Sequence, residues 1–284
     1  MSTENVDISW PKKVVFSSVL LACGLLVFVF GSNYYSVFPT NDSQIYRGAL
    51  ATIFLAAALI LRRRQSSKVY SQIAYAFFVA ITAFFVTSLT AGVRDSLLSA
   101  LNIPESAPRH ISIAKVFEAV IVVSVILMLT ALWRQDMGSL YLKKGRLGMG
   151  LFVGVSLLTI NTATGIVTGA TLGHAADVLI ARLPWVLLFS LANGFMEELW
   201  FRGLFLRHFA AVVGIIGSII VTAIVFTLSH AAASYMDPTE AILFQVIIFP
   251  MALLFAYLMH KSDGLWGSAL YHAGSDVFLL YLMG

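Results

Sequence analysis

The sequence predicts an all-α fold, a polytopic membrane helix bundle with eight or nine transmembrane helices. Three observations predict this class: 59% of the 284 residues are hydrophobic, only 11% are charged, and the mean hydropathy is +0.89. Soluble proteins carry roughly 25% charged residues, so the composition excludes an ordinary soluble domain. Long apolar runs follow one another along the chain, and a run of about 20 residues crosses a hydrocarbon core of ~30 Å.

Nine apolar runs are candidate spans. The run at 46–61 is short, and the run at 149–172 is polar from Thr159 to Thr164, so we count eight or nine spans. In chain order the runs cover residues 14–31, 46–61, 69–92, 112–133, 149–172, 183–207, 213–232, 240–260 and 265–283. No linker, low-complexity tract or internal repeat separates them. We expect residues 1–148 to form N-terminal accessory helices, and residues 149–284 to form a second half of four or five helices that carries the chemistry.

The basic residues between the runs predict the orientation. Twelve of the 18 lysines and arginines fall on one side of an alternating topology and four on the other, which places the N-terminus in the cytoplasm. The cytoplasmic set is Lys12, Lys13, Arg62, Arg63, Arg64, Lys68, Arg134, Lys143, Lys144, Arg146, Arg207 and Lys261; the opposite set is Arg47, Arg94, Arg109 and Arg182. Residues 281–284 carry no retention signal, so we expect the plasma (inner) membrane. The small net charge of +4 indicates no nucleic-acid partner.

The sixth run carries three charges. Arg182 and Pro184 predict its start, since proline is tolerated in the first helical turn, and Glu197, Glu198 and Arg202 follow. A charge inside a bilayer costs at least ~2.5 kcal/mol, so its default interpretation is functional. Glu198 and Arg202 are four apart and can pair, which leaves Glu197 on another face, free for chemistry. The alternative is a helix end at the headgroups with a surface ion pair.

Two further polar groups lie downstream. Phe226 and His230 are four residues apart at the end of the seventh run, and His272 and Asp276 have the same spacing in the last run. In each pair, the two residues therefore lie on the same face of their helix. A single intramembrane histidine can be a satisfied core residue, but a set of carboxylates and imidazoles in consecutive spans favours a site between facing helices.

The spacing places Glu197 and His230 at one depth. The sixth and seventh runs form a hairpin that should turn near Val213–Gly214, and positions 197 and 230 are equidistant from it, roughly 25 Å away at ~1.5 Å per residue. Glu197 then lies about 15 Å from the inner surface by the same rise. Gly194, just before the glutamates, should let a neighbouring helix or a substrate approach closely.

Such a group fits two kinds of hydrolytic chemistry. A carboxylate and an imidazole that hold one water form a general-base pair, and a second imidazole can stabilise an oxyanion. Two histidines with carboxylates would also satisfy Zn²⁺, whose ligands would be Glu197, His230, His272 and Asp276. The single Cys23 excludes a cysteine-based site, and no helical His-Glu-x-x-His motif is present. The spacing of these residues does not decide between general-base catalysis and a zinc site.

At these residues the chain resembles the CAAX protease and bacteriocin-processing family of intramembrane proteases. That family's pattern is Glu-Glu-x-x-x-Arg, then Phe-x-x-x-His, then His-x-x-x-Asn or Asp, on separate spans. Here the three motifs read Glu197-Glu198-x-x-x-Arg202, Phe226-x-x-x-His230 and His272-x-x-x-Asp276. The similarity covers residues 160–284, and the first half matches only in being polytopic.

The resemblance implies roles for these residues. Glu197 and His230 would activate the water that attacks a peptide bond, and His272 and Asp276 would line the oxyanion site. Glu198 and Arg202 would orient the helix and the substrate, with Phe226 beside His230. A metal-free glutamate mechanism, with no required cofactor, is the favoured interpretation.

Asp276 departs from the CAAX-processing members, which carry asparagine at this position. An ionised aspartate cannot donate a hydrogen bond to an oxyanion. Asp276 must therefore be protonated, orient His272, or bind a metal. The departure also argues against carrying a prenylated substrate over to this chain.

Three functions compete. The first is an intramembrane endopeptidase that cuts a membrane-associated protein or peptide near the inner leaflet: a CAAX-type lipidated C-terminus, a C-terminal sorting signal or a leader peptide. The second is a non-catalytic immunity or scaffold protein of the same fold. The third is a proton-coupled transporter, because relays also use intramembrane carboxylates and histidines. Transporters commonly show inverted repeats, and the sequence shows no such symmetry.

Overall fold

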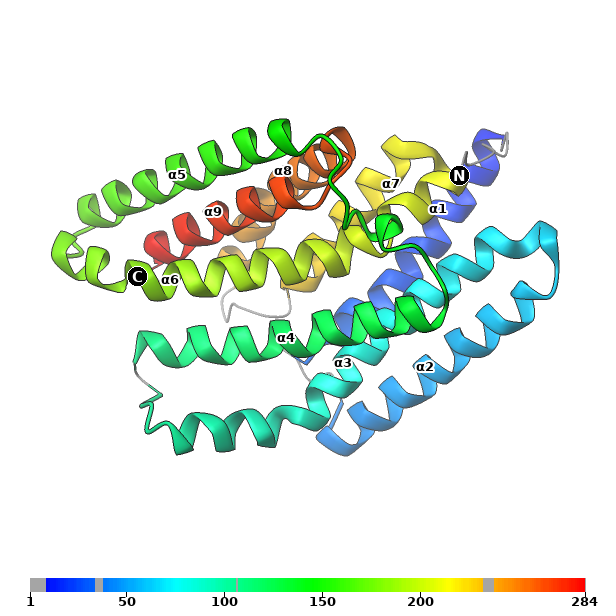
Figure 1. The fold of residues 1–284 in the computed structure, drawn as a ribbon, viewed down its shortest axis with the longest axis horizontal. Helices are drawn as coiled ribbons and strands as arrows, with labels where there is room; N and C mark the ends of the chain where they lie inside the picture. Colours follow the sequence, from blue (N-terminus) through cyan, green and yellow to red (C-terminus); the bar gives the residue numbers. More distant parts are fainter. Residues whose placement is uncertain (1–8, 34–37, 106, 232–237, 284) are drawn as a thin grey trace.

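The fold is a bundle of long helices, seen in a computed structural model that describes residues 9–33, 38–105, 107–231 and 238–283 (Figure 1). Within these ranges the chain forms nine α-helices and no β-strand, which confirms the predicted all-α class. Eight helical segments are long and apolar enough to cross a membrane. The protein is therefore an integral multi-pass membrane protein.

Two of the long helices continue into short π-helical segments. The α-helices are α1 (Trp10–Leu25), α2 (Thr40–Arg62), α3 (Lys68–Ala100), α4 (Pro108–Leu132), α5 (Leu147–Thr171), α6 (Ala176–Glu197), α7 (Leu206–Ala231), α8 (Pro238–Ser262) and α9 (Trp266–Met283). The π-helices are η1 (Leu26–Phe30), which continues α1, and η4 (Glu198–Gly203), which continues α6. Two short 3-10 helices, η2 (Gln65–Ser67) and η3 (Met137–Leu140), lie in connecting segments. The last helix, α9, packs against α5 and α6 (Figure 1).

Several predicted span ends differ from the helices, and two of them concern Pro184 and Arg47. The sixth span begins at Ala176, so Pro184 lies inside α6 rather than at its start. The earlier turns are held because Leu179 is buried and its carbonyl accepts a 2.7 Å hydrogen bond from the Tyr281 hydroxyl. The second span begins at Thr40, which places Arg47 inside α2.

Arg47 serves the fold rather than the membrane surface. It is buried, with only 5% of its surface exposed. Its Nε donates to the carbonyl of Gly31 and its Nη2 to that of Ser32, each at 2.8 Å. Helix ends leave backbone carbonyls without partners, and this guanidinium satisfies the ones that follow η1.

The predicted turn between the sixth and seventh spans is present. Gly214 has φ 77° and ψ 166°, a left-handed conformation that interrupts α7 and that glycine adopts without steric cost. Across this turn the Ser218 hydroxyl donates to the Leu206 carbonyl at 2.7 Å. The second part of α7 then returns to Glu197 at the end of α6, whose Oε2 lies 3.7 Å from His230 Nε2.

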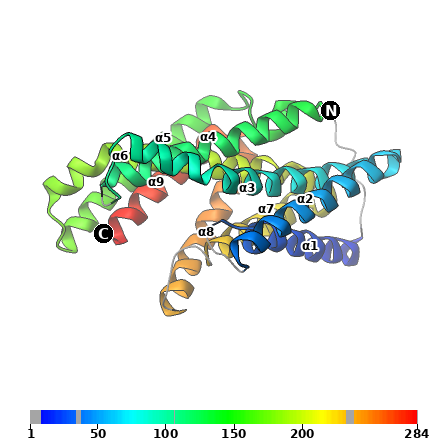
Figure 2. The same cartoon turned by 90° about the horizontal axis from the view of Figure 1, so that it is seen from below.

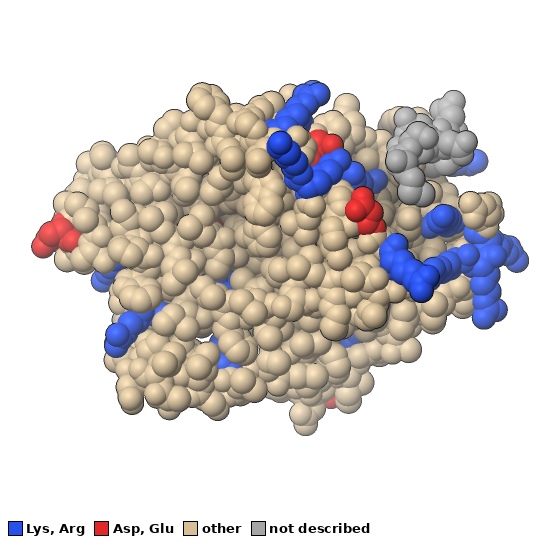
Figure 3. Space-filling view, in the orientation of Figure 1, with Lys and Arg blue, Asp and Glu red and all other residues tan. Residues whose placement is uncertain are grey.

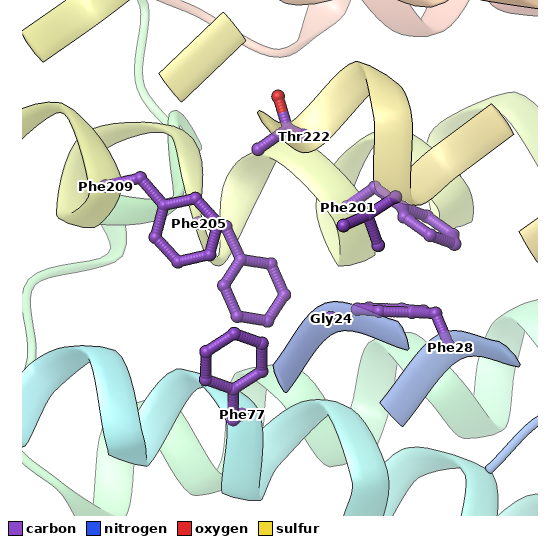
Figure 4. Close-up of a pocket in the computed structure, with 8 residues that line it drawn as sticks. Gly24, Phe28, Phe77, Phe201, Phe205, Phe209 and Thr222 are labelled. Atoms are coloured by element: carbon purple, nitrogen blue, oxygen red, sulfur yellow. The ribbon is translucent and has the colours of Figure 1, made fainter. Parts of the chain in front are cut away.

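The accessory helices brace the second half through aromatic rings. Phe28 of η1 lies 4.1 Å from Phe201 of η4, centroid to centroid, and Trp200 of η4 donates its indole N–H to the Ala80 carbonyl of α3. Figure 4 shows Phe28 and Phe201 with three further phenylalanines, Phe77, Phe205 and Phe209, around a small pocket. Its free volume is about 10 Å³. An apolar void of that size stays dry, so this pocket is a packing feature and not a substrate site.

Glycines set the distance between α5 and α9. A Cβ atom on Gly274 would lie 2.6 Å from the Leu158 Cα, and one on Gly267 would lie 2.6 Å from the Gly150 carbonyl oxygen. Such contacts require close backbone approach, which small residues permit between membrane helices. Gly194 on α6 meets α9 in the same way, since a Cβ atom on it would lie 2.8 Å from the Ala269 carbonyl oxygen. The expectation that a neighbouring helix approaches Gly194 is confirmed.

We expect Gly274→Ala to destabilise the protein, because its methyl group would push α9 away from α5. Overpacking of this kind costs about 1–3 kcal/mol. Thermal unfolding in detergent, followed by helical circular dichroism, measures the effect. Gly148→Ala is the matched control in α5, since a Cβ there meets nothing within 4 Å. An unchanged Tm for Gly274→Ala would contradict the close packing described above.

The surface separates charged ends from an apolar middle. Figure 3 shows lysines and arginines gathered over the α2–α3 turn and the segment before α5, with few charges over the centre of this face. Viewed from below, the first turns of α8 stand away from the bundle (Figure 2). Ile242, Leu243 and Val246 are accordingly exposed there. These features agree with a bundle surrounded by lipid, while the cytoplasmic N-terminus stays a prediction.

Candidate active site

Glu198 and Arg202 form the buried base of the site. Both side chains are completely buried, and the Glu198 Oε1 to Arg202 Nη1 distance is 2.9 Å. Burial rules out the alternative of an ion pair at the membrane surface. The guanidinium also lies 4.0 Å from the centre of the Phe226 ring and donates to the Ala252 carbonyl at 3.3 Å. A buried ion pair needs such additional partners to offset its desolvation.

Both oxygens of Glu198 bind neighbours on α9. Oε1 lies 2.9 Å from His272 Nδ1, and Oε2 accepts from the Ser268 hydroxyl at 2.5 Å. Because a carboxylate paired with arginine carries no hydrogen, the His272 Nδ1 must be the donor. Glu198 therefore fixes the ring of His272 and cannot serve as a base.

A change of helix type separates the two glutamates. The α-helical part of α6 ends at Glu197, and the π-helix η4 begins at Glu198. Within η4 the Leu204 N–H donates to the Leu199 carbonyl, five residues earlier. Short π-helical segments occur frequently at functional sites because they change the direction of side chains within one helix. Here Glu198 is directed to its partners on α9, while Glu197 stays available.

Glu197 lies between the two histidines. Its Oε2 is 3.7 Å from His230 Nε2 and 3.5 Å from His272 Nε2, and its side chain is 9% exposed. No hydrogen-bond partner for Oε2 is present in the described part of the chain. These separations exceed a direct hydrogen bond. Groups at such distances are commonly bridged by a water molecule.

His230 is oriented by its own helix. Its Nδ1 lies 2.8 Å from the Phe226 carbonyl, which can only accept, so Nδ1 carries a hydrogen. The ring also contacts the Phe226 ring at 4.5 Å between centroids. The Nε2 atom is then left facing Glu197. The predicted meeting of Glu197 and His230 at one depth is therefore present in the structure.

His272 and Asp276 face each other on α9. The Nε2 of His272 is 3.5 Å from Asp276 Oδ1, and the Asp276 Oδ2 accepts from Asn193 Nδ2 at 3.0 Å. Phe255 of α8 stacks on the imidazole, with 4.6 Å between centroids and 7° between planes. Two carboxylates, Glu197 and Asp276, thus approach His272 Nε2 from different helices.

Three residues of the site escaped sequence reasoning. Ser268 binds Glu198, Asn193 binds Asp276, and Phe255 stacks on His272. A signal existed for two of them, because Ser268 is four residues before His272 and Asn193 is four residues before Glu197, each on the same helical face. Phe255 carried no signal, since an aromatic residue in an apolar helix is ordinary.

The predicted metal ligands do not form a coordination sphere. Among the described residues, no three His, Cys, Asp or Glu side chains are arranged to hold a metal ion. The Nδ1 atoms of both site histidines bind Glu198 and the Phe226 carbonyl, which leaves only their Nε2 atoms for a metal. The arrangement as it stands does not fit Zn²⁺, and no step below involves a metal.

Comparison with known proteins identifies this part of the chain. Residues 179–278 match the family model described as type II CAAX prenyl endopeptidase Rce1-like. The segment contains Glu197, Glu198, Arg202, Phe226, His230, His272 and Asp276. This part of the chain is similar to that family. No curated protein and no solved structure gives a significant match to the chain.

The matched segment confirms the resemblance drawn from the three motifs. It runs from α6 to α9 and so contains every helix that contributes to the site. Its family is one of CAAX-type intramembrane proteases. The α5 helix lies before the matched segment, although it packs closely on α9. The division of the chain at residue 149 remains a prediction.

Proposed function

We propose that this protein is an intramembrane endopeptidase that hydrolyses a peptide bond of a membrane-associated protein or peptide. The observation that carries the proposal is the position of Glu197, a nearly buried carboxylate with a free oxygen between two imidazoles. An unpaired charge inside a membrane protein is costly and marks function. Substrates of three kinds suit a site within the bundle: a CAAX-type C-terminus, a C-terminal sorting signal or a leader peptide.

The first step is water activation. A water between Glu197 Oε2 and His230 Nε2 would donate one hydrogen bond to each, because both atoms are acceptors. As the water oxygen attacks the carbonyl carbon of the substrate, its proton passes to Glu197, and a tetrahedral intermediate with one oxyanion forms. General-base catalysis of this kind contributes about 10²–10⁴-fold to the rate.

The second step is breakdown of the intermediate. His272 supports the oxyanion: Asp276 and Glu198 hold a hydrogen on each ring nitrogen, and the Nε2–H is then available to the developing charge. The proton taken up by Glu197 passes to the amide nitrogen, and the C–N bond breaks. The products are a new carboxyl terminus and a new amine, and Glu197 returns to its starting form. Asp276 orients His272 in this scheme and does not donate to the oxyanion itself.

Glu198 and Arg202 hold this arrangement in place. The ion pair is the fixed point to which Ser268 and His272 are attached, and it joins α6 to α9. Catalytic geometry has to be held within fractions of an ångström, and a buried hydrogen-bond network provides that rigidity. The pair thereby acts through His272 and not on the substrate.

A comparison of protein termini tests the proposal. The protein and its Glu197→Gln variant are expressed in cells that lack it, and the termini of membrane and secreted proteins are compared by mass spectrometry. Glutamine keeps the shape of the side chain and removes the base. We expect a small set of proteins to keep unprocessed termini only with the variant. Identical termini, with both proteins folded and present, would overturn the proposal in favour of a scaffold function.

Removal of divalent metals is expected to leave cleavage unchanged, because the proposed steps use only side chains and water. The test treats the purified protein with EDTA and with 1,10-phenanthroline, and follows cleavage of a substrate found in the terminus comparison. A known zinc protease in the same detergent is the positive control. Loss of activity that Zn²⁺ restores would show that the four predicted ligands rearrange to bind a metal.

A further inference from the structure

Asn193 is a buried amide with incomplete hydrogen bonding. It lies on α6 one turn before Glu197, and only 6% of its surface is exposed. Its Nδ2 donates to Asp276 Oδ2 at 3.0 Å, whereas its Oδ1 has no partner among the described residues. A buried polar group without a partner costs free energy, and more so within a membrane. An amide of this kind requires a reason beyond packing.

The bond from Asn193 determines how Asp276 meets His272. A carboxylate rotates freely about its last torsion unless one oxygen is held. Asn193 holds Oδ2, which leaves Oδ1 directed to His272 Nε2 at 3.5 Å. The two residues come from different helices, α6 and α9, so the bond also fixes Asp276 relative to Glu197. An aspartate needs such a donor, since it has no hydrogen of its own to fix its direction.

We propose that Asn193 is a positioning residue of the active site. It holds Asp276 so that Oδ1 faces His272 Nε2 at 3.5 Å, beyond a direct hydrogen bond. The nearby carboxylate charge favours a hydrogen on Nε2, and that N–H stays available to the reacting carbonyl. The inference rests on the proposed protease function and assigns a role to a residue outside the three sequence motifs. It also explains how aspartate functions at position 276: a neighbouring amide supplies the hydrogen bond that keeps the side chain in place.

Charged side chains from several helices surround His272. Glu197 and Glu198 approach from α6 and η4, Asp276 lies on its own helix, and Arg202 is paired with Glu198. His230 faces the site from α7, and α4 contributes the Lys115–Glu118 ion pair, joined at 2.7 Å. The Lys115 ammonium lies 5.5 Å from the Phe189 ring, one turn before Asn193 on α6. Among these charged groups, Asn193 is an uncharged side chain, and it donates a hydrogen bond to Asp276.

A double-mutant cycle between Asn193 and Asp276 tests the proposal. Asn193→Leu removes the donor at similar volume, and Asp276→Asn provides a side chain with its own N–H. We expect Asn193→Leu to lower kcat by up to about a hundredfold, the effect of a displaced catalytic group, with KM little changed. In the Asp276→Asn background the same substitution should change kcat by less than about threefold, because coupled residues are non-additive. The probe is a substrate found in the terminus comparison.

A second readout needs no substrate. In protein labelled with ¹⁵N-histidine, the Nε2 chemical shift of His272, assigned with His272→Gln, reports whether that nitrogen carries hydrogen. We expect a protonated Nε2 in the wild type and a shift towards the unprotonated form in Asn193→Leu. Ser190→Ala is the matched control. Ser190 is a completely buried α6 residue one turn earlier, and its hydroxyl has no hydrogen-bond partner among the described residues.

The outcomes separate the two proposals. Equal losses of kcat from Asn193→Leu in both backgrounds, or an unchanged His272 signal, would overturn the role of Asn193. Absence of any cleavage by the wild type would overturn the proposed function, and the histidine signal would still decide whether Asn193 positions Asp276.

Discussion

Arg202→Met should unfold or strongly destabilise the protein, by about 3–5 kcal/mol, because it leaves the Glu198 carboxylate buried without its counter-charge. Glu198 is completely buried, so it cannot turn to water to recover its hydration. Methionine fills a similar volume, which keeps the loss of packing small. The measurement is the Tm in detergent, together with the yield of monodisperse protein in size-exclusion chromatography.

The control for this prediction is an arginine–carboxylate ion pair at the surface. Arg94 and Asp95 are 2.8 Å apart, with side chains 38% and 63% exposed. Arg94→Met should shift stability by less than about 1 kcal/mol, since exposed ion pairs contribute little. In the double variant Arg202→Met/Glu198→Gln the buried charge is gone, and part of the stability should return. Equal Tm losses for Arg202→Met and Arg94→Met would contradict the buried role of the pair.

The buried ion pair also shows how far the sequence could predict the site. Spacing of four predicted Glu198–Arg202, Phe226–His230 and His272–Asp276, because helical periodicity is local and reads directly from residue numbers. The meeting of Glu197 and His230 followed from a hairpin turn at a glycine. These predictions needed only helix geometry and the cost of charge in a membrane.

The interhelical partners could not be predicted in the same way. Ser268 reaches Glu198 and Asn193 reaches Asp276 because α9 crosses α6 at Gly194, and the rotation of one helix against another depends on packing along its whole length. The π-helix at Glu198–Gly203 was missed as well. This single π-helical turn adds one residue to the helix, and no sequence pattern distinguishes it from an α-helical turn. The start of α6 was misplaced because Pro184 resembles a first-turn proline.

Substitution of Glu197 and of His230 should produce losses of activity that do not add. Each side chain is proposed to hold the same water, so Glu197→Gln or His230→Gln alone should lower kcat by about 10²–10⁴-fold. Residues that act as one unit lose most of their joint effect with the first substitution. The kcat of the double variant should therefore be only slightly below that of the less active single variant.

Single-turnover kinetics on one substrate, with Tm measured for each variant, distinguishes this cooperation from unfolding. Glutamine is close in size to both residues, and Glu197 makes no hydrogen bond through Oε2 to another described residue, so little stability should be lost. His230→Gln gives up the 2.8 Å contact from Nδ1 to the Phe226 carbonyl and should cost slightly more. Fully additive losses, tenfold or more beyond either single variant, would mean that the two residues act in different steps. Water activation would then belong to Glu197 alone, and His230 would act on the leaving group.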